Sequence, residues 1–203
     1  MSAGRARWEF SVDEVADLLS LLDRRLQRRG VAASVFVVGG AAVAATGVRR
    51  GRLTEDVDAI VKEQAVLEEA RALAEERGLP ENWLNPKASM WMPPLPYGVL
   101  HRPSRRGLRV TYADDGFLFA TKLIAQRAKD ADDVVALAER LGMTAASADE
   151  LGAHLRRYYT DRAALELIVD GDEVDRELRF LAEDAAGLLK PRSSADAWPR
   201  PPR

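Results

Sequence analysis

The chain has 203 residues, which predicts one domain or one domain with a small appendage. Its 30 Lys and Arg against 32 Asp and Glu give a formal net charge of −2, which excludes a globally basic nucleic-acid-binding protein but leaves room for a local basic cleft. The absence of Cys excludes a disulfide framework, a thiolate nucleophile and a Cys-ligated zinc site, and two His are too few for a His-rich metal site.

Apolar patterning gives no sign of a membrane or an export segment. No apolar run approaches the roughly 18 residues that a membrane span needs, and residues 1–7 lack the apolar core of a signal peptide. We therefore expect a cytoplasmic protein without a membrane partner, built from both helices and strands.

The first predicted element is a helix that begins after Ser11. Ser11 and Glu14 have the spacing of a capping box, in which each residue satisfies a backbone donor of the other. Gly30 is expected to end this helix. The apolar residues that would face the core recur at helical spacing: Val15, Leu18, Leu19, Leu22 and Leu26.

Strands and helices are predicted to alternate in the next part of the chain. β-branched and aromatic side chains favour the strands, and Gly39-Gly40 breaks the first of them before a short helix. Residues 79–107 hold six prolines and are expected to be irregular, which is typical of a functional or mobile loop. The predicted strands are 35–38, 57–61 and 108–112, and the predicted helices between them are 41–45 and 64–77.

Only helices are predicted after the third strand. Asp114 or Asp115 would cap a helix that starts near Phe117 and passes through Lys122, and Ser147 opens a second capping box. The remaining predicted helices are 132–141, 148–159 and about 172–189.

The order of these elements predicts an α+β fold, with a small mixed β-sheet flanked by helices and an all-helical C-terminal part. A change of composition near Gly142 is the only internal boundary that the sequence suggests. The expected divisions are a core over 8–142, a helical subdomain over 143–189 and a disordered Pro- and Arg-containing tail over 190–203.

Asp56 and Asp58 form the first candidate functional pair. Side chains alternate along a strand, so these two carboxylates would share one face, where they repel each other. A divalent cation between them would remove that repulsion, and hard oxygen ligands suit Mg²⁺, or alternatively Mn²⁺. An acid pair of this kind, taken alone, also fits a solvated strand edge.

Gly39 and Gly40 form the second candidate feature. Glycines between a strand and a helix let a phosphate approach the backbone, where free N–H groups favour negative charge. A metal at one strand and an anion cradle at the next are what phosphoryl or nucleotidyl transfer requires. Neither the P-loop pattern nor Gly-x-Gly-x-x-Gly occurs, and a Gly-Gly taken alone also fits a plain turn.

Gly-Gly followed by Arg-x-Thr-x-Asp-x-Asp at residues 52–58 resembles the nucleotidyltransferase fold of polymerase β-like enzymes. Leu79–Asn85 resembles a Leu-Pro-x-x-Trp-Leu-Asn signature of a bacterial nucleotidyltransferase-like family of uncharacterised function, and Lys122–Asp133 resembles a later signature of the same family. That family is similar to the AbiEii and MenT group, the nucleotidyltransferase halves of toxin–antitoxin pairs. The resemblance covers residues 35–135, about half of the chain.

The resemblance implies a role for each residue that matches the motifs. It places the triphosphate at Gly39 and Gly40, the metal at Asp56 and Asp58, the nucleotide near Arg52 and Thr54, the phosphates at Lys122, and a further catalytic carboxylate at Asp130.

The third predicted strand departs from the family pattern, because it holds no acid where many polymerase-like members have a metal ligand. Asp130 is the first candidate for the missing carboxylate and Asp133 the second. In one unbroken helix Lys122 and Asp133 would lie near one line, which favours Asp133 on geometry. Arg127, in the same signature, is a further candidate site residue.

We therefore expect a Mg²⁺-dependent nucleotidyltransferase that moves a nucleoside monophosphate from a nucleoside triphosphate to an acceptor. By resemblance the acceptor is tRNA and the protein is a toxin restrained by an antitoxin. Two alternatives stay open. One is an adenylyltransferase acting on a small molecule such as an antibiotic, and the other, suggested by the missing acid, is a non-catalytic nucleotide-binding subunit.

Some residues that could bind RNA have a plainer interpretation. Arginines cluster at 102–109 and at 156–157, where they could hold an RNA backbone, but an ordinary solvated surface also explains them. Trp83 and Trp91 are expected to anchor the core or a loop rather than to stack on bases. No role is assigned to His101 or His154.

Overall fold

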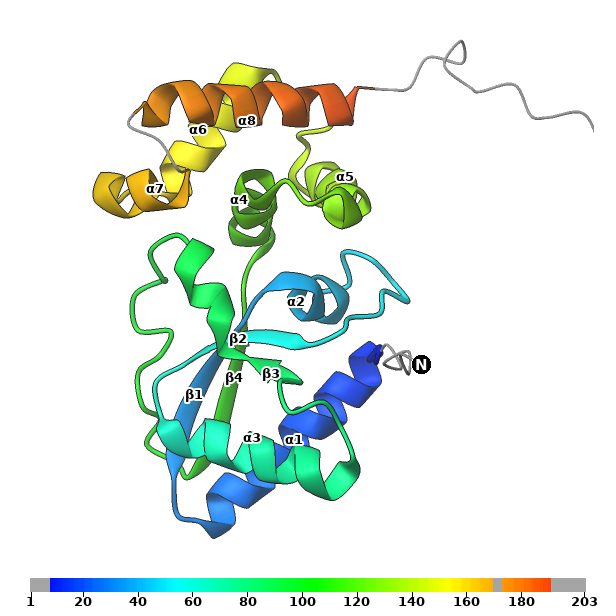
Figure 1. The fold of residues 1–203 in the computed structure, drawn as a ribbon, viewed down its shortest axis with the longest axis vertical. Coiled ribbons are helices and arrows are strands. Elements are labelled where there is room, and N and C mark those ends of the chain that lie inside the picture. Colours follow the sequence, from blue (N-terminus) through cyan, green and yellow to red (C-terminus); the bar gives the residue numbers. More distant parts are fainter. Residues whose placement is uncertain (1–7, 170–172, 191–203) are drawn as a thin grey trace, which may run out of the picture.

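The computed structural model of the chain describes residues 8–169 and 173–190, except for the side chains of residues 88–90. A four-stranded mixed sheet lies in one half of the molecule with helices around it, and further helices fill the other half (Figure 1). This arrangement confirms the predicted α+β fold class.

The sheet has the strand order β3-β2-β1-β4. β1 pairs antiparallel with β2 and parallel with β4, and β2 pairs parallel with the short β3. Every residue of β1 is buried, as expected for the central strand. The three predicted strands are confirmed, whereas the short β3 was not predicted. The strands are β1 (Ala32–Val37), β2 (Val57–Val61), β3 (Leu84–Asn85) and β4 (Gly107–Tyr112).

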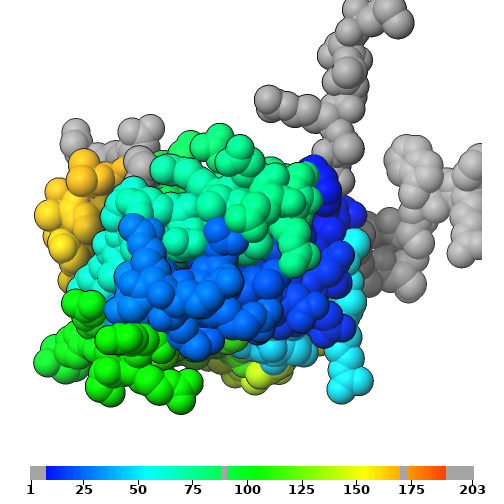
Figure 2. Space-filling view, turned by 90° about the horizontal axis from the view of Figure 1, so that it is seen from below, coloured from blue at the N-terminus to red at the C-terminus, as the bar shows by residue number. Residues whose placement is uncertain are grey.

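Helices α1 (Val12–Arg28) and α3 (Gln64–Arg77) pack against each other below the sheet in Figure 1. The predicted capping box of Ser11 is present at the start of α1, and all five predicted core residues of this helix are buried. Arg25 joins the two helices through Glu69 at 2.7 Å and Glu76 at 2.8 Å. Figure 2, the view from below, shows α1 in blue beside α3 in blue-green.

The proline-containing segment between α3 and β4 is held by hydrogen bonds to its backbone. Trp83 is fully buried, and its Nε1 donates to the carbonyl of Ala70 at 2.9 Å, so the prediction of a core anchor is confirmed for Trp83. Arg109 donates to three carbonyls of the segment, and Arg102 donates to the carbonyl of Ala32. These two arginines therefore support the loop. The segment also contains the 3₁₀ helix η1 (Pro86–Trp91).

The chain between Lys122 and Asp133 is not one unbroken helix, so that expectation is wrong. Asp114 caps α4 by accepting from the backbone N–H of Phe117. α4 then ends at Gln126, whose φ of 42° is left-handed, and the chain turns through a 3₁₀ helix before the next helix. The elements are α4 (Asp115–Ala125), η2 (Ala128–Asp130) and α5 (Ala131–Leu141).

The C-terminal helices pack on one another and on α4. The predicted capping box of Ser147 is confirmed at α6, while α7 was not predicted. The predicted start of the last helix at Asp172 and residues 191–203 of the predicted tail lie outside the described residues. Within the described ranges, no helix combines the length and the apolar character needed to cross a membrane. The helices are α6 (Ala148–Tyr158), α7 (Arg162–Ile168) and α8 (Val174–Leu189).

Candidate functional site

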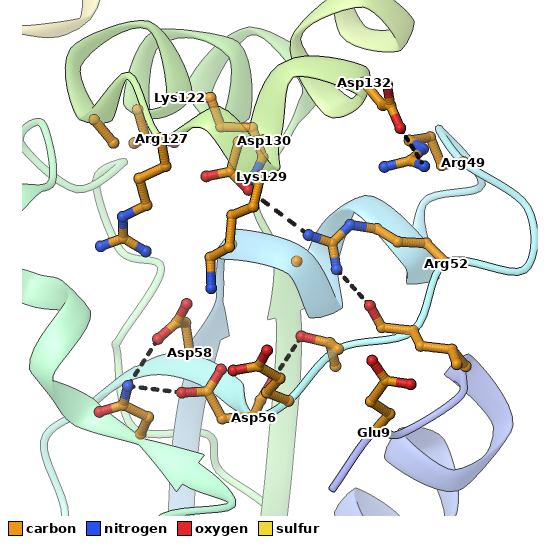
Figure 3. A pocket seen from close by; sticks show the side chains of 18 of the residues that line it. Glu9, Arg49, Arg52, Asp56, Asp58, Lys122, Arg127, Lys129, Asp130 and Asp132 are labelled. Atoms are coloured by element: carbon orange, nitrogen blue, oxygen red, sulfur yellow. Dashed lines mark hydrogen bonds and ion pairs between the residues drawn. The ribbon is translucent and has the colours of Figure 1, made fainter. Parts of the chain in front are cut away.

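A cavity of about 600 Å³ lies between the start of β2 and the segment that joins α4 to α5 (Figure 3). The short helix α2 (Gly39–Ala45) contributes its first turn to the same cavity. Asp133, which is fully buried, is the only predicted site residue that does not line it. The others do: Gly39, Gly40, Arg52, Thr54, Asp56, Asp58, Lys122, Arg127 and Asp130.

Asp56 and Asp58 are brought together by a residue to which the sequence analysis gave no role. The side-chain nitrogen of Asn85 donates to Asp56 Oδ2 at 2.9 Å and to Asp58 Oδ1 at 3.0 Å. Asn85 lies opposite Asp58 because β3 pairs in parallel with β2 at this register. The two carboxylates therefore lie on one side of the chain, as their spacing predicts. The sequence signal that could have identified Asn85 as a site residue was its position at the end of the Leu79–Asn85 signature.

The orientation of the Asn85 amide is fixed by a third hydrogen bond. Its oxygen accepts from the backbone N–H of Lys87 at 3.1 Å, at the start of η1. The amide nitrogen must therefore face the carboxylates, because exchanging the two atoms would set oxygen against oxygen. Asn85 thus joins the acid pair to η1.

The acid pair carries unbalanced negative charge. Burial raises the pKa of Asp58 to about 6, and the neighbouring charge of Asp56 acts in the same direction. Arg127, Lys122 and Lys129 partly oppose this shift from across the cavity. Among the residues described, neither Asp56 nor Asp58 forms an ion pair.

These two carboxylates fit a hard divalent cation. Carboxylate oxygens are its preferred ligands, and a cation would offset both the burial of the Asp58 charge and the repulsion from Asp56, which together raise the pKa of Asp58. The described part of the chain offers no cluster of three or more His, Cys, Asp or Glu able to hold a metal. A metal at this pair would thus draw its remaining ligands from water and from a bound phosphate, the arrangement that is usual for Mg²⁺.

Gly39 and Gly40 allow the close approach of two site residues. Gly39 has a φ of +61°, and a Cβ on it would lie 2.5 Å from Asp58 Oδ2. A Cβ on Gly40 would overlap the guanidinium of Arg52. The diglycine therefore serves the packing of the site, and it leaves bare backbone along the cavity wall.

Asp130 and Asp133 neutralise basic side chains instead of joining Asp56 and Asp58. Lys122 Nζ lies 2.9 Å from Asp130 Oδ1 and 2.9 Å from Asp133 Oδ2. Asp133 also accepts from Arg49 at 2.7 Å and pairs with Arg52 at 2.8 Å. Burial raises the pKa of Asp133, but the hydrogen bonds from Arg52, Lys122 and Arg49 outweigh it and hold that pKa well below its usual range.

The wall opposite the acid pair is basic. Arg127 and Lys129 extend from the α4–α5 segment into the cavity, on the side that faces Asp58 (Figure 3). Arg49 and Lys87 also line the cavity. Of these four residues only Arg127 was a predicted site residue. The one sequence signal for Arg49 was its position three residues before Arg52.

Comparison of the chain with protein-family models, with curated proteins and with solved structures gives no match. The geometry of the cavity and the sequence motifs are therefore the two grounds for a functional proposal.

Proposed function

We propose that this protein is a Mg²⁺-dependent nucleotidyltransferase, which moves a nucleoside monophosphate from a nucleoside triphosphate to an acceptor hydroxyl and releases pyrophosphate. One observation carries the proposal. Asp56 and Asp58 converge on a single amide nitrogen, with no cationic side chain of the described residues paired to either, in a cavity whose facing wall is basic. This separation of charge suits a metal–triphosphate, whose cation meets the acids while its phosphates meet the basic side chains.

Asp56 and Asp58 would hold the metal, which when bound would stabilise negative charge on the phosphates as a Lewis acid. Arg127 and Lys129, both exposed and extending into the cavity, would neutralise the triphosphate. The backbone at Gly39 and Gly40 would lie against it, since no side chain keeps a phosphate away.

Other predicted site residues would position the groups that touch the ligand. Asp130 and Asp133 hold Lys122 at the cavity wall through ion pairs of 2.9 Å. Thr54 Oγ1 donates to the carbonyl of Asp56 at 2.9 Å and so shapes the turn before β2. Arg52 lies against Asp133 and fixes the same turn from the other side.

We propose tRNA as the acceptor and a toxin–antitoxin pair as the setting. The motif resemblance supports both, and the basic side chains that line the cavity suit a polyanionic acceptor. Incubation with all four α-phosphate-labelled nucleoside triphosphates, Mg²⁺ or Mn²⁺, and total tRNA tests the activity. We expect labelled RNA with the wild type, none with Asp58→Asn, and normal labelling with Asp149→Asn, whose exposed side chain does not line the cavity.

Failure of label transfer with every nucleotide and both metals would refute the transferase proposal. Label that moves to a small hydroxyl compound, with RNA left unlabelled, would retain the chemistry but replace the acceptor. Growth arrest on expression would support the toxin setting, whereas drug tolerance with normal growth would point to antibiotic modification.

One observation favours a second candidate, a nucleotide-binding subunit without catalysis. β4 holds no acid, and the two later candidates, Asp130 and Asp133, are both occupied by basic partners. Calorimetric titration with nucleoside triphosphate and Mg²⁺ distinguishes the two functions. Tight binding that is lost in Asp58→Ala, without turnover on any acceptor, would favour the binding subunit.

A further inference from the structure

Trp91 presents an aromatic ring to the same cavity. It is the last residue of η1, it is 47% exposed, and it lines the cavity with Asp56 and Asp58. Trp83, earlier in the same segment, is fully buried, so the two tryptophans differ in role. The expectation that tryptophans here are anchors holds for Trp83, whereas the ring of Trp91 is open to a ligand.

The backbone under this ring is fixed at both ends of η1. At the start, Asn85 accepts from the N–H of Lys87 and donates to the acid pair. At the end, the hydroxyl of Tyr159, which is 5% exposed, donates to the carbonyl of Trp91 at 2.9 Å. A rigid support with an exposed ring loses little conformational entropy when a ligand packs on it.

The length of η1 suits a nucleotide. Six steps at the 3₁₀ rise of about 2 Å place Trp91 roughly 12 Å along the helix from Asn85, the residue that binds the acid pair. An extended nucleotide spans a comparable length from its outer phosphates to its base. The cavity also has the size of a typical small-ligand site, about 300–1,000 Å³.

Trp91 is one of three large apolar residues that line a mostly charged cavity. Leu53, 48% exposed, and Met92 also line the wall, whereas most of the remaining side chains there are polar or charged. A ligand that fills this cavity must combine an anionic end with a flat apolar end. Aromatic faces bind nucleobases by stacking, with little dependence on which base is present.

We propose that the face of Trp91 stacks on the nucleobase of a nucleotide whose phosphates lie in the cavity between the acid pair and the basic side chains of Arg127 and Lys129. This base subsite rests on the proposed function and adds the residue that would hold the base. The base can come from the donor triphosphate or from the terminal nucleotide of an RNA acceptor, and the stacking chemistry is the same for both.

Equilibrium binding to full-length protein with Mg²⁺ tests the subsite with three probes: a nucleoside triphosphate, inorganic triphosphate and a short single-stranded RNA. We expect Trp91→Ala to weaken binding of a base-containing probe by about 5- to 150-fold. Trp91→Phe should retain most of the affinity but lose the ligand-induced quenching of fluorescence. Trp8→Ala is the matched control, because Trp8 is 44% exposed and does not line the cavity.

The three probes separate the possible outcomes. Weakened binding of nucleoside triphosphate alone assigns the donor base, and weakened binding of RNA alone assigns the acceptor base. Unchanged affinity for both probes, or an equal loss for inorganic triphosphate, would overturn the subsite. If inorganic triphosphate does not bind the wild type, the proposed function fails, while a Trp91-dependent affinity for RNA would still support stacking.

Discussion

The charge on Asp58 destabilises the folded protein, and Asp58→Asn should stabilise it. Burial and the charge of Asp56 raise the pKa of Asp58 from its ordinary 3.8 to about 6. At about 1.4 kcal/mol per unit of pKa, the ionised group costs at most about 3 kcal/mol of unfolding free energy at neutral pH. Solvent reaches part of this side chain, so we expect a gain of about 1–2 kcal/mol from the substitution. The amide oxygen of the new Asn can still accept from Asn85.

The raised pKa of Asp58 determines how the unfolding free energy changes with pH. The folded state binds the Asp58 proton more tightly than the unfolded state, so the stabilising contribution is complete below about pH 4 and disappears as pH rises through about 6. Urea unfolding of wild type and Asp58→Asn in EDTA should therefore give similar free energies near pH 4. The variant should be more stable at pH 7.

Bound Mg²⁺ should make the wild type more stable than Asp58→Asn, which is the opposite of the order expected in EDTA at neutral pH. Mg²⁺ that binds only the folded wild type raises its unfolding free energy, whereas Asp58→Asn, with one ligand weakened, should respond little. Asp132→Asn is the control, since its exposed side chain makes a surface ion pair worth at most about 1 kcal/mol. An Asp58→Asn variant that is less stable than wild type at neutral pH in EDTA would show that the acid pair is not strained.

Two further substitutions test the surroundings of the pair. Asp133→Ala removes the buried carboxylate that Arg49, Arg52 and Lys122 share and leaves Lys122 and Arg52 with Asp130 and Arg49 with Asp132. It should lower the unfolding free energy by about 3 kcal/mol, against about 1 or less for Asp132→Ala, and equal losses in urea unfolding would contradict the buried network. Gly39→Ala and Gly47→Ala should each lower the unfolding free energy by about 1–2 kcal/mol, because both glycines have a left-handed backbone conformation. Only Gly39→Ala displaces the Asp58 carboxylate, so only this variant should bind Mg²⁺ more weakly in a calorimetric titration. Equal Mg²⁺ affinity in both variants would refute the close approach of Gly39.

Local signals in the sequence were enough to predict most of the fold. The capping boxes at Ser11 and Ser147 depend on residues three positions apart, and β1 depends on a continuous apolar run. The acid pair was predictable for the same reason, because alternation along an extended chain needs no tertiary information.

Contacts between distant segments could not be predicted in this way. Asn85 meets the acid pair only because a two-residue strand pairs in one particular register with β2. Lys122 contacts both later acids because the chain turns at Gln126, a residue type that rarely adopts a left-handed conformation. In an unbroken helix Asp130 and Asp133 would lie about 12 and 16 Å along the axis from Lys122, too far to contact it, so the choice between them depended on a turn that the sequence does not signal.

Asp133 also determines which parts of the cavity can move. It belongs to α5, yet it binds Arg49 and Arg52 from the turn before β2 as well as Lys122 from α4. One buried carboxylate thus fastens the basic wall to the turn that leads into the acid pair. A motion that separates this turn from α5 must break the contacts of Asp133 with both Arg49 and Arg52, so these two parts of the cavity wall are tied to move together.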